Sequence, residues 1–151
     1  MKEDKIHLLI KEVIRLAPDF RKQFSRIKIN SESKLTPHQY YSLILINKHE
    51  KLSMGEIADK LGVSNQQITR IMDGLVDLRL VERFVDPTNR RLVQTKINDN
   101  GKKVIREYER ALSQNWVTEL SVLTIEEIEA SIEHLKALNK ILEKTALPRV
   151  H

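Results

Sequence analysis

The stretch that decides the fold runs from residue 53 to residue 97 and reads SMGEIADKLGVSNQQITRIMDGLVDLRLVERFVDPTNRRLVQTKI. Its first half predicts two short helices, because Ser53 and Ser64 are capping residues and each is followed three positions later by Glu or Gln. Gly62 ends the first helix before the second begins. Two short capped helices separated by a glycine-containing turn are the layout of a helix-turn-helix.

A β-hairpin is predicted directly after the second helix. Residues 80–85 and 92–97 are rich in β-forming side chains, and the turn sequence DPTN lies between them. The tip and the return strand carry Arg90 and Arg91. A hairpin of this kind straight after a helix-turn-helix is a wing.

Long amphipathic helices are predicted on both sides of this module. Apolar residues recur at helical spacing over residues 5–27, where Pro18 must either kink the helix or restart it. Thr36 caps a helix before the helix-turn-helix, Asn98 or its neighbour caps one after the wing, and Thr124 caps a last one. The expected fold class is mainly α with a small β-hairpin wing. The long apolar stripes exceed what one small core needs, which favours self-association.

The composition excludes several classes of protein. The chain has 151 residues and no cysteine, which rules out a disulfide scaffold, cysteine-ligated zinc and a thiol nucleophile. Its longest aliphatic run, residues 43–46, is far too short to span a membrane, and the N-terminus lacks the basic lead-in of a signal peptide. We therefore expect a cytoplasmic protein without a membrane partner. The net charge of +5 makes a polyanionic partner plausible.

The polar face of the second helix of the helix-turn-helix is the first candidate binding surface. Asn and Gln make paired hydrogen bonds to adenine, and Arg pairs with guanine in the major groove of DNA. The candidate residues of this recognition helix are Ser64, Asn65, Gln66, Gln67, Thr69 and Arg70. The alternative is a solvated helix face, but Asn and Thr are poor helix formers and an unusual choice for such a face.

The wing and the starts of two helices supply further candidates. The wing residues are Arg83, Asp86, Asn89, Arg90 and Arg91, and candidate phosphate contacts are Thr36, His38 and Ser53. Arginine suits the narrow minor groove, where the potential is most negative. The alternative is an exposed β-turn with incidental charge.

Metal binding and catalysis find little support in the sequence. His38, His49 and His134 lie on three different predicted elements without the spacing of a helical zinc site, so we predict no metal and no cofactor. Ligands converging from several helices remain the alternative. No glycine-rich phosphate loop, nucleophile elbow or carboxylate motif stands out, and we expect no enzymatic activity.

Six stretches of the sequence together resemble the MarR family. They are LTPHQY (35–40), MGEIADKLGVS (54–64), TRIMDGL (69–75), LVER (80–83), DPTNRR (86–91) and INDNG (97–101). The resemblance extends over roughly residues 5–145 of the single chain 1–151. It implies a winged helix-turn-helix DNA-binding lobe over residues 35–98, flanked by dimerisation helices in residues 1–30 and 99–147.

The resemblance also implies a function. Such a protein is a transcriptional regulator, usually a repressor, that binds a pseudo-palindromic operator in double-stranded DNA as a homodimer and is released by a small, often aromatic and anionic, effector. In the family's wing, the acid at the position of Asp86 helps to hold the arginine at the position of Arg90. The alternative reading is a helical ligand- or metal-binding protein whose winged helix contacts another protein.

Three positions depart from the family's pattern. Asn89 stands where Asp is usual, which removes a charge from the wing. Arg79 stands where Gly usually follows the recognition helix, and a left-handed conformation there costs Arg roughly 1 kcal/mol relative to Gly. Asn98 stands where Thr usually caps the helix after the wing, and it is an equivalent cap.

A non-covalent ligand is the expected regulatory signal, because the chain has no thiol to oxidise. The predicted pocket lies where the first helix, the helix over residues 37–47 and the start of the helix over residues 99–117 meet. Its candidate residues are Phe20, Phe24, Tyr40, Tyr41 and Tyr108 as an aromatic lining, with Arg15 or Arg21 for a carboxylate. The alternative is that these aromatic residues are ordinary core.

Overall fold

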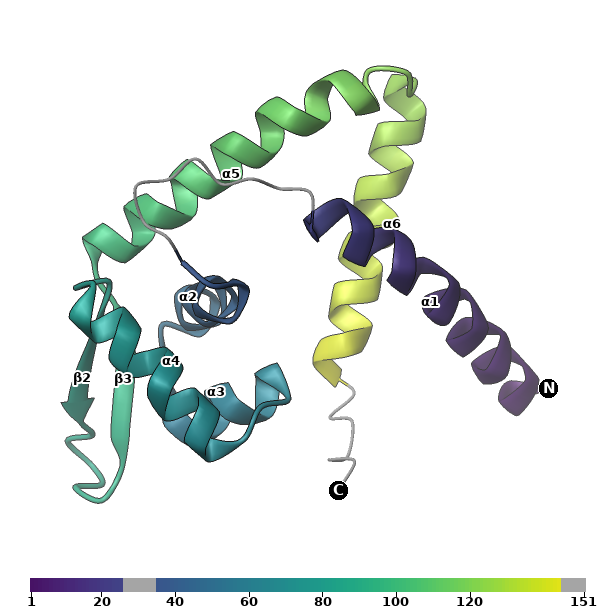
Figure 1. Cartoon of the computed structure of the whole chain (residues 1–151). Helices are drawn as coiled ribbons and strands as arrows, with labels where there is room; N and C mark the ends of the chain where they lie inside the picture. Colours follow the sequence, from purple (N-terminus) through teal and green to yellow (C-terminus); the bar gives the residue numbers. More distant parts are fainter. Residues whose placement is uncertain (26–34, 145–151) are drawn as a thin grey trace. The chain divides into compact units, whose positions relative to one another are not determined.

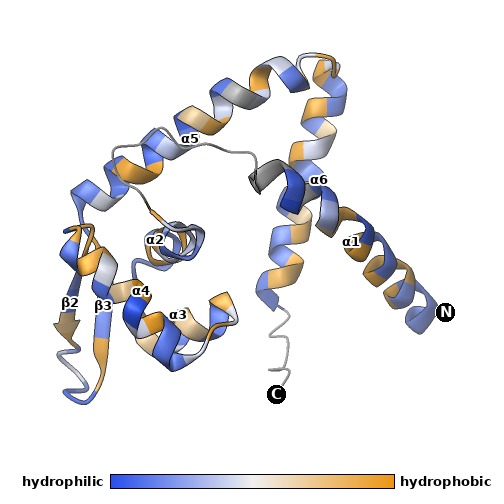
Figure 2. Cartoon of the chain, in the orientation of Figure 1, coloured by the Kyte–Doolittle hydropathy of each residue, from blue (hydrophilic) through white to orange (hydrophobic). Residues whose placement is uncertain are grey.

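The structure, a computed structural model, describes residues 1–25 and 35–144, without the side chains of residues 20, 23–25 and 115. The chain divides into two units, residues 1–30 and residues 31–151. In the first unit, helix α1 (Lys2–Ser25) runs without interruption through Pro18, so the helix does not restart there (Figure 1). Apolar and polar residues alternate along α1 (Figure 2), and Ile6, Leu9 and Val13 are 46%, 47% and 44% exposed.

The second unit contains the remaining elements. They are α2 (Pro37–His49), β1 (Lys51–Ser53), α3 (Met54–Leu61), α4 (Asn65–Asp77), β2 (Val81–Val85), β3 (Val93–Ile97), α5 (Asp99–Leu120) and α6 (Ile125–Lys144). The predicted fold class is confirmed: the chain is mainly helical, with a small antiparallel sheet that includes the wing. No helix among the described residues is both long and apolar enough to cross a bilayer.

The capping residues predicted from the sequence begin their helices as expected. Reciprocal capping boxes join Thr36 to Gln39 and Ser53 to Glu56. A third joins Ser64 to the residue at N3 of α4. These boxes satisfy backbone N–H groups that otherwise have no partner in the first turn of a helix. They fix where α2, α3 and α4 start.

The sheet has three strands in the order β1-β3-β2. The central strand β3 pairs antiparallel with both neighbours, so that Thr95 lies opposite Leu52 on one side and Arg83 on the other. The short strand β1 is an addition to the predicted hairpin. It ties the segment between α2 and α3 to the wing.

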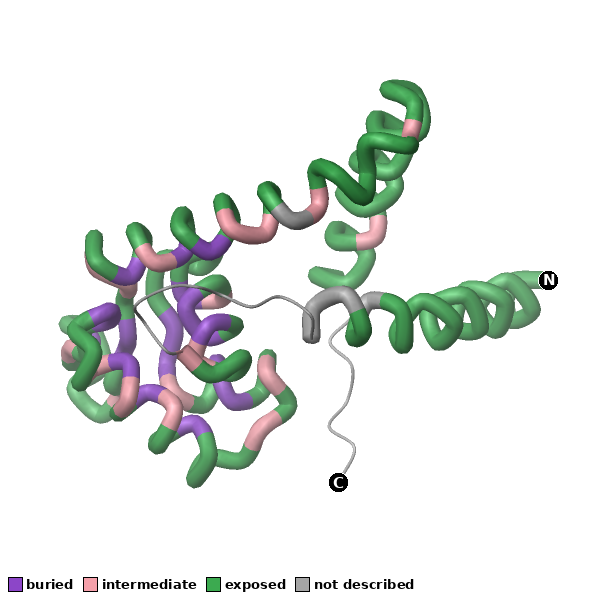
Figure 3. Tube along the Cα trace, turned by 45° about the horizontal axis from the view of Figure 1, so that its top comes forward, coloured by how far each residue is buried: buried purple, intermediate pink, exposed green. Residues whose placement is uncertain are grey.

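The hydrophobic core lies among α2, α3, α4 and the sheet (Figure 3). Its most deeply buried side chains are Leu43, Ile46, Ile57, Ile68, Met72 and Leu75. The first half of α5 joins this core through Ile105, which is 5% exposed. Burying these side chains is the main term that holds the lobe together.

Helix α6 contrasts with this core. None of its residues is buried, and Ile128, Ile132 and Leu135 are 39%, 45% and 49% exposed. An ion pair of 2.5 Å joins Glu143 near its end to Lys48 in the last turn of α2. This contact lies on the surface, so it contributes little to stability by itself.

Candidate nucleic-acid interface

Helix α4 carries the predicted recognition surface. Its buried side, formed by Ile68, Met72 and Leu75, packs into the core and fixes which side of the helix faces outward. All of the predicted recognition residues, at the N-cap and in the first half of α4, are exposed: Ser64, Asn65, Gln66, Gln67, Thr69 and Arg70. The six residues are thus accessible around the N-terminal half of α4, with Gln67 on the side that extends toward α2.

The exposed polar groups of α4 are not equally available to a ligand. The side-chain oxygen of Gln67 accepts a hydrogen bond from the backbone N of Ser64 at 3.1 Å, and the hydroxyl of Thr69 donates to the backbone oxygen of Asn65 at 2.9 Å. In the described part of the chain, the side chains of Asn65, Gln66 and Arg70 have no hydrogen-bond partner. These three side chains are therefore the groups on α4 that are most available to a ligand.

Strand β2 is tied to α4 by an ion pair. The guanidinium of Arg83 donates to the carboxylate of Asp73 at 2.7 Å, and the two side chains are 33% and 53% exposed. The sequence predicted Arg83 as a DNA contact and gave Asp73 no role. A charge-assisted hydrogen bond of this length holds the base of the wing against the recognition helix.

The turn of the wing is built around Asp86, which is 6% exposed. Its Oδ1 accepts hydrogen bonds from the backbone N of Thr88 at 2.8 Å, from the Thr88 hydroxyl at 2.6 Å and from the backbone N of Asn89 at 3.3 Å. Its Oδ2 lies 3.7 Å from the Nζ of Lys51 on β1. These hydrogen bonds, that of the Thr88 hydroxyl first, lower the pKa of Asp86.

The arginines at the tip of the wing remain exposed. Among the described residues, no hydrogen bond or ion pair joins Asp86 to Arg90, so the acid orders the turn and does not hold this arginine directly. The side-chain oxygen of Asn89 accepts a hydrogen bond from the backbone N of Arg91 at 3.2 Å, so Asn89 helps to shape the tip of the wing. Arg90 and Arg91 are both exposed.

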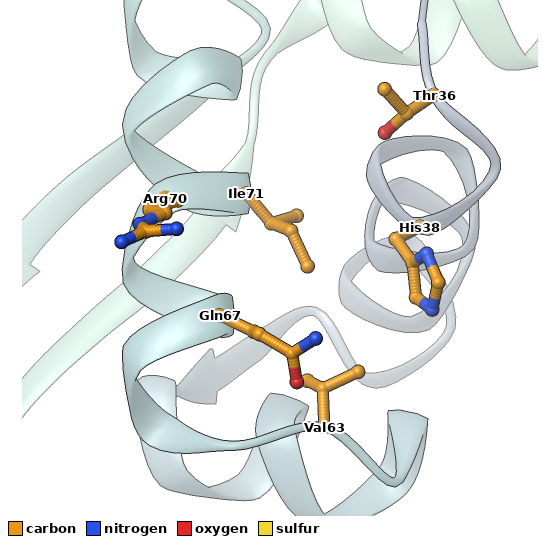
Figure 4. A pocket seen from close by; sticks show the side chains of 6 residues that line it. All are labelled: Thr36, His38, Val63, Gln67, Arg70 and Ile71. Carbon is orange, nitrogen blue, oxygen red and sulfur yellow. The ribbon is translucent and has the colours of Figure 1, made fainter.

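A hollow separates the start of α2 from α4 (Figure 4). Gln67 and Ile71 extend from α4 toward α2, where Thr36 and His38 lie. Thr36 and His38 are exposed, as a phosphate contact requires. The third predicted phosphate contact, Ser53, is corrected by the structure.

Ser53 is not available to a phosphate. It is 8% exposed, and its hydroxyl donates to Glu56 at 2.8 Å while accepting from the backbone N of Glu56 at 3.3 Å. Its capping role uses the group that a phosphate would need. The sequence showed this capping pattern, and the phosphate assignment overlooked that the same hydroxyl cannot easily serve both partners.

The charges on this surface favour an anion. Residues 64–97 carry six Lys or Arg and four Asp or Glu. Of the acids, Asp73 is paired with Arg83, and Glu82 is paired with Lys96 at 3.2 Å. Arg70 on α4 and Arg90 on the wing have no acidic partner in the part of the chain that the structure describes.

The predicted effector residues belong to both units of the chain, and those of the second unit are three tyrosines. Tyr40 on α2 and Tyr108 on α5 are buried, and their rings lie 3.5 Å apart between centroids. Burial raises the pKa of both hydroxyls. Tyr41 is 40% exposed and lies edge-on to Tyr40 at 6.2 Å.

The remaining predicted effector residues belong to α1. Arg15 pairs with Glu12 at 3.3 Å, and Arg21 is exposed. The side chains of Phe20 and Phe24 lie outside the described residues. The effector pocket therefore stays a prediction. Across the described ranges, no three His, Cys, Asp or Glu side chains come together in a way that could hold a metal ion.

A helix-turn-helix followed by an antiparallel hairpin, with a polar recognition helix and a basic wing, defines a winged-helix protein. Residues 33–92 match the model of the MarR family. A MarR family protein from Bacillus stearothermophilus has the same fold, with a TM-score of 0.72 at 22% identity over 95% of this chain and 99% of that one. The matched residues, which hold the helix-turn-helix and most of the wing, are thus similar in sequence to the MarR family.

Two of the curated relatives, YfiV and MdtR, are from Bacillus subtilis (strain 168). YfiV, an uncharacterised HTH-type transcriptional regulator, is 32% identical over 101 residues, which cover 67% of this chain and 63% of YfiV. MdtR, an HTH-type transcriptional repressor, is 29% identical over 94 residues, which cover 62% of this chain and 61% of MdtR. The chain thus spans slightly less than two thirds of either relative. Neither name describes an enzyme, in agreement with the sequence prediction.

Proposed function

We propose that this protein is a sequence-specific regulator of transcription that binds double-stranded DNA. The observation that carries the proposal is the exposed face of α4, where Asn65, Gln66 and Arg70 lie free beside a basic wing. Asn, Gln and Arg are the side chains that make paired hydrogen bonds to adenine and guanine in the major groove. The Arg83–Asp73 pair keeps the wing and the recognition helix together, so both can meet one duplex.

We further propose that the protein binds a pseudo-palindromic operator as a homodimer. Support comes from the apolar side chains that α1 and α6 leave exposed, because apolar stripes of this length are costly in water unless a partner covers them. Ile14 on α1 and Ile125 on α6 are 66% and 71% exposed. A two-fold dimer then requires half-sites related by the same symmetry, roughly 10 bp apart.

Repression and release by an effector complete the proposal. Repression is supported by the similarity to MdtR, whose name describes a repressor. A small aromatic or anionic effector that favours a DNA-incompetent arrangement by roughly 1–3 kcal/mol would lower operator affinity about 5- to 150-fold. Titration of salicylate-like acids against a protein–operator complex tests this part, with mild peroxide as the control for an oxidative response.

The experiment that tests DNA binding is selection of bound sequences from random duplexes, followed by affinity measurements over a range of salt concentrations. Phosphate neutralisation predicts that the logarithm of the affinity falls steeply and linearly with the logarithm of the salt concentration. Arg70→Ala should weaken the preference for particular sequences among the bound duplexes. Arg110→Ala, on the exposed surface of α5, is the matched control and should leave that preference unchanged. Failure to select any sequence, with no salt dependence, would favour a winged helix that contacts protein.

A further inference from the structure

A strained corner joins the recognition helix to the wing. Helix α4 ends at Asp77, and Arg79 then takes a positive φ of 56°. This left-handed conformation is disfavoured for a residue with a Cβ atom, and it persists only where the surroundings determine it. Only residues 78–80 separate α4 from β2, so the conformation of Arg79 sets the direction in which the wing leaves the helix.

One side chain holds this corner from the other end of the hairpin. The side-chain N–H of Asn98 donates to the backbone oxygen of Arg79 at 2.8 Å, and the backbone N of Asn98 donates to the oxygen of Leu80 at 3.2 Å. The side-chain oxygen of Asn98 accepts from the backbone N of Gly101 at 3.0 Å, which caps α5. The amide of Asn98 therefore serves two elements at once.

The start of α5 fits closely against the same corner. A Cβ atom on Gly101 would lie 2.3 Å from the backbone oxygen of Leu80, a distance that no packed structure tolerates. The glycine thus lets the first turn of α5 approach the corner, and this approach brings Asn98 within reach of Arg79. The hydrogen bond from Asn98 depends on this close packing.

We propose that Asn98 is a positioning residue that holds the strained Arg79 corner and thereby sets the angle between the recognition helix and the wing. This rests on the proposed function, because it assigns the corner a role in DNA binding. The two residues form an interdependent pair. Glycine would keep a left-handed corner without help, whereas Arg79 needs the bond that Asn98 donates.

The test separates the two roles of the Asn98 side chain. Asn98→Asp keeps an oxygen that caps α5 but removes the N–H that bonds to Arg79, and Asp caps a helix as well as Asn does. Asn100→Asp, at an exposed position two residues away, adds the same charge without touching the corner. Both aspartate variants are made in two backgrounds, one with the natural Arg79 and one with Arg79→Gly.

Affinity is measured for a duplex selected by the natural protein. Loss of one ordinary hydrogen bond predicts about a 5-fold loss of affinity for Asn98→Asp relative to Asn100→Asp. With Arg79→Gly present, the two aspartate variants should bind within about 2-fold of each other, because glycine keeps the corner unaided. Equal losses in both backgrounds, or no loss in either, would overturn the proposal.

A second readout does not depend on DNA. Amide hydrogen exchange of Arg79 should accelerate in Asn98→Asp but not in Asn100→Asp, because its N–H donates to Val76 within the corner at 2.9 Å. Unchanged exchange would overturn the proposal even where DNA binding is lost. If exchange is faster in Asn98→Asp but the natural protein binds no duplex, the Asn98–Arg79 pair stands and the proposed DNA-binding function is rejected. The failure of this inference and the failure of the proposed function are therefore distinguishable.

Discussion

Arg83 on β2 donates a hydrogen bond of 2.7 Å to Asp73 on α4, and this pair links the recognition helix to the base of the wing. Both side chains are partly exposed, so we expect the pair to contribute only about 0.2–1 kcal/mol to the free energy of unfolding. A double-mutant cycle of Asp73→Ala and Arg83→Ala by urea denaturation measures this coupling. Single-variant effects that simply add would show that the pair has no energetic role.

Arg70 and Arg90 should affect DNA binding in different ways. Arg70→Ala removes a free cation from the recognition helix and should cost ~1–3 kcal/mol while relaxing the base preference. Arg90→Ala should weaken binding more evenly across sequences, because a minor-groove arginine senses mainly groove width. Sequence selection with each variant checks this difference. Negligible effects from both changes would mean that the binding surface lies elsewhere.

Gly101→Ala should destabilise the lobe. The added methyl group would meet the backbone oxygen of Leu80 and the side chain of Ile97, which lies 2.6 Å from the new atom. Overpacking of this kind costs typically about 1–3 kcal/mol. Thermal unfolding measures the effect, with Gly55→Ala as the control, since no atom lies within 4 Å of the corresponding position. Equal stability of the two variants would contradict the close approach of α5.

The lowered pKa of Glu56 should make the free energy of unfolding depend on pH. Its carboxylate accepts from the backbone N of Ser53 at 2.8 Å, and this bond lowers the pKa of Glu56 below its usual value of 4.5. A lowered pKa in the folded state stabilises the protein fully above 4.5, and this contribution is lost as the pH falls through the lowered pKa. The stability difference between the natural protein and Glu56→Gln should therefore shrink on acidification.

Urea midpoints measured from about pH 7 to about pH 3 check this expectation. Glu129→Gln on the exposed surface of α6 is the control for the loss of one carboxylate. A difference for Glu56→Gln that is independent of pH would show that the capping bond does not favour the charged carboxylate.

The apolar face of α6 should carry part of a dimer interface. Light scattering should give about 35 kDa, twice the chain mass of 17.6 kDa. Ile132→Glu and Leu135→Glu place charges on exposed apolar positions and should shift the protein toward the monomer, because an unpaired charge in an interface is costly. Glu133→Gln on the same helix is the control. A natural protein that is monomeric at micromolar concentration would contradict both the dimer and the operator symmetry.

The sequence predicted local features well because they depend on neighbours in the chain. Thr36, Ser64 and Asn98 begin their helices because their side chains bond to the backbone three residues later. The glycine that the family usually has at the position of Arg79 raised a left-handed conformation only as a condition, and Arg79 has a φ of 56°. Each of these caps needs only a few consecutive residues, so no tertiary structure had to be known, whereas the conformation of Arg79 also involves the hydrogen bond from Asn98, 19 residues along the chain.

Features that depend on distant residues were missed. Strand β1 has only three residues, and its partner Thr95 lies far along the chain from Leu52. The partner of Arg83 is likewise a matter of packing between α4 and β2, since no sequence motif points to Asp73. The burial of Ser53 likewise depends on packing in the folded lobe, although its capping pattern with Glu56, which competes with a phosphate, was visible in the sequence.

The hydrogen bonds that Asp86 accepts from Thr88 and Asn89 have a kinetic consequence. A turn that is already ordered loses little conformational entropy when a partner arrives. The wing can therefore dock without first searching for its bound shape, and its association should be limited mainly by diffusion and charge steering. Sequence changes at this turn would then act first on how fast complexes form, whereas changes on the recognition helix would act on how long they last.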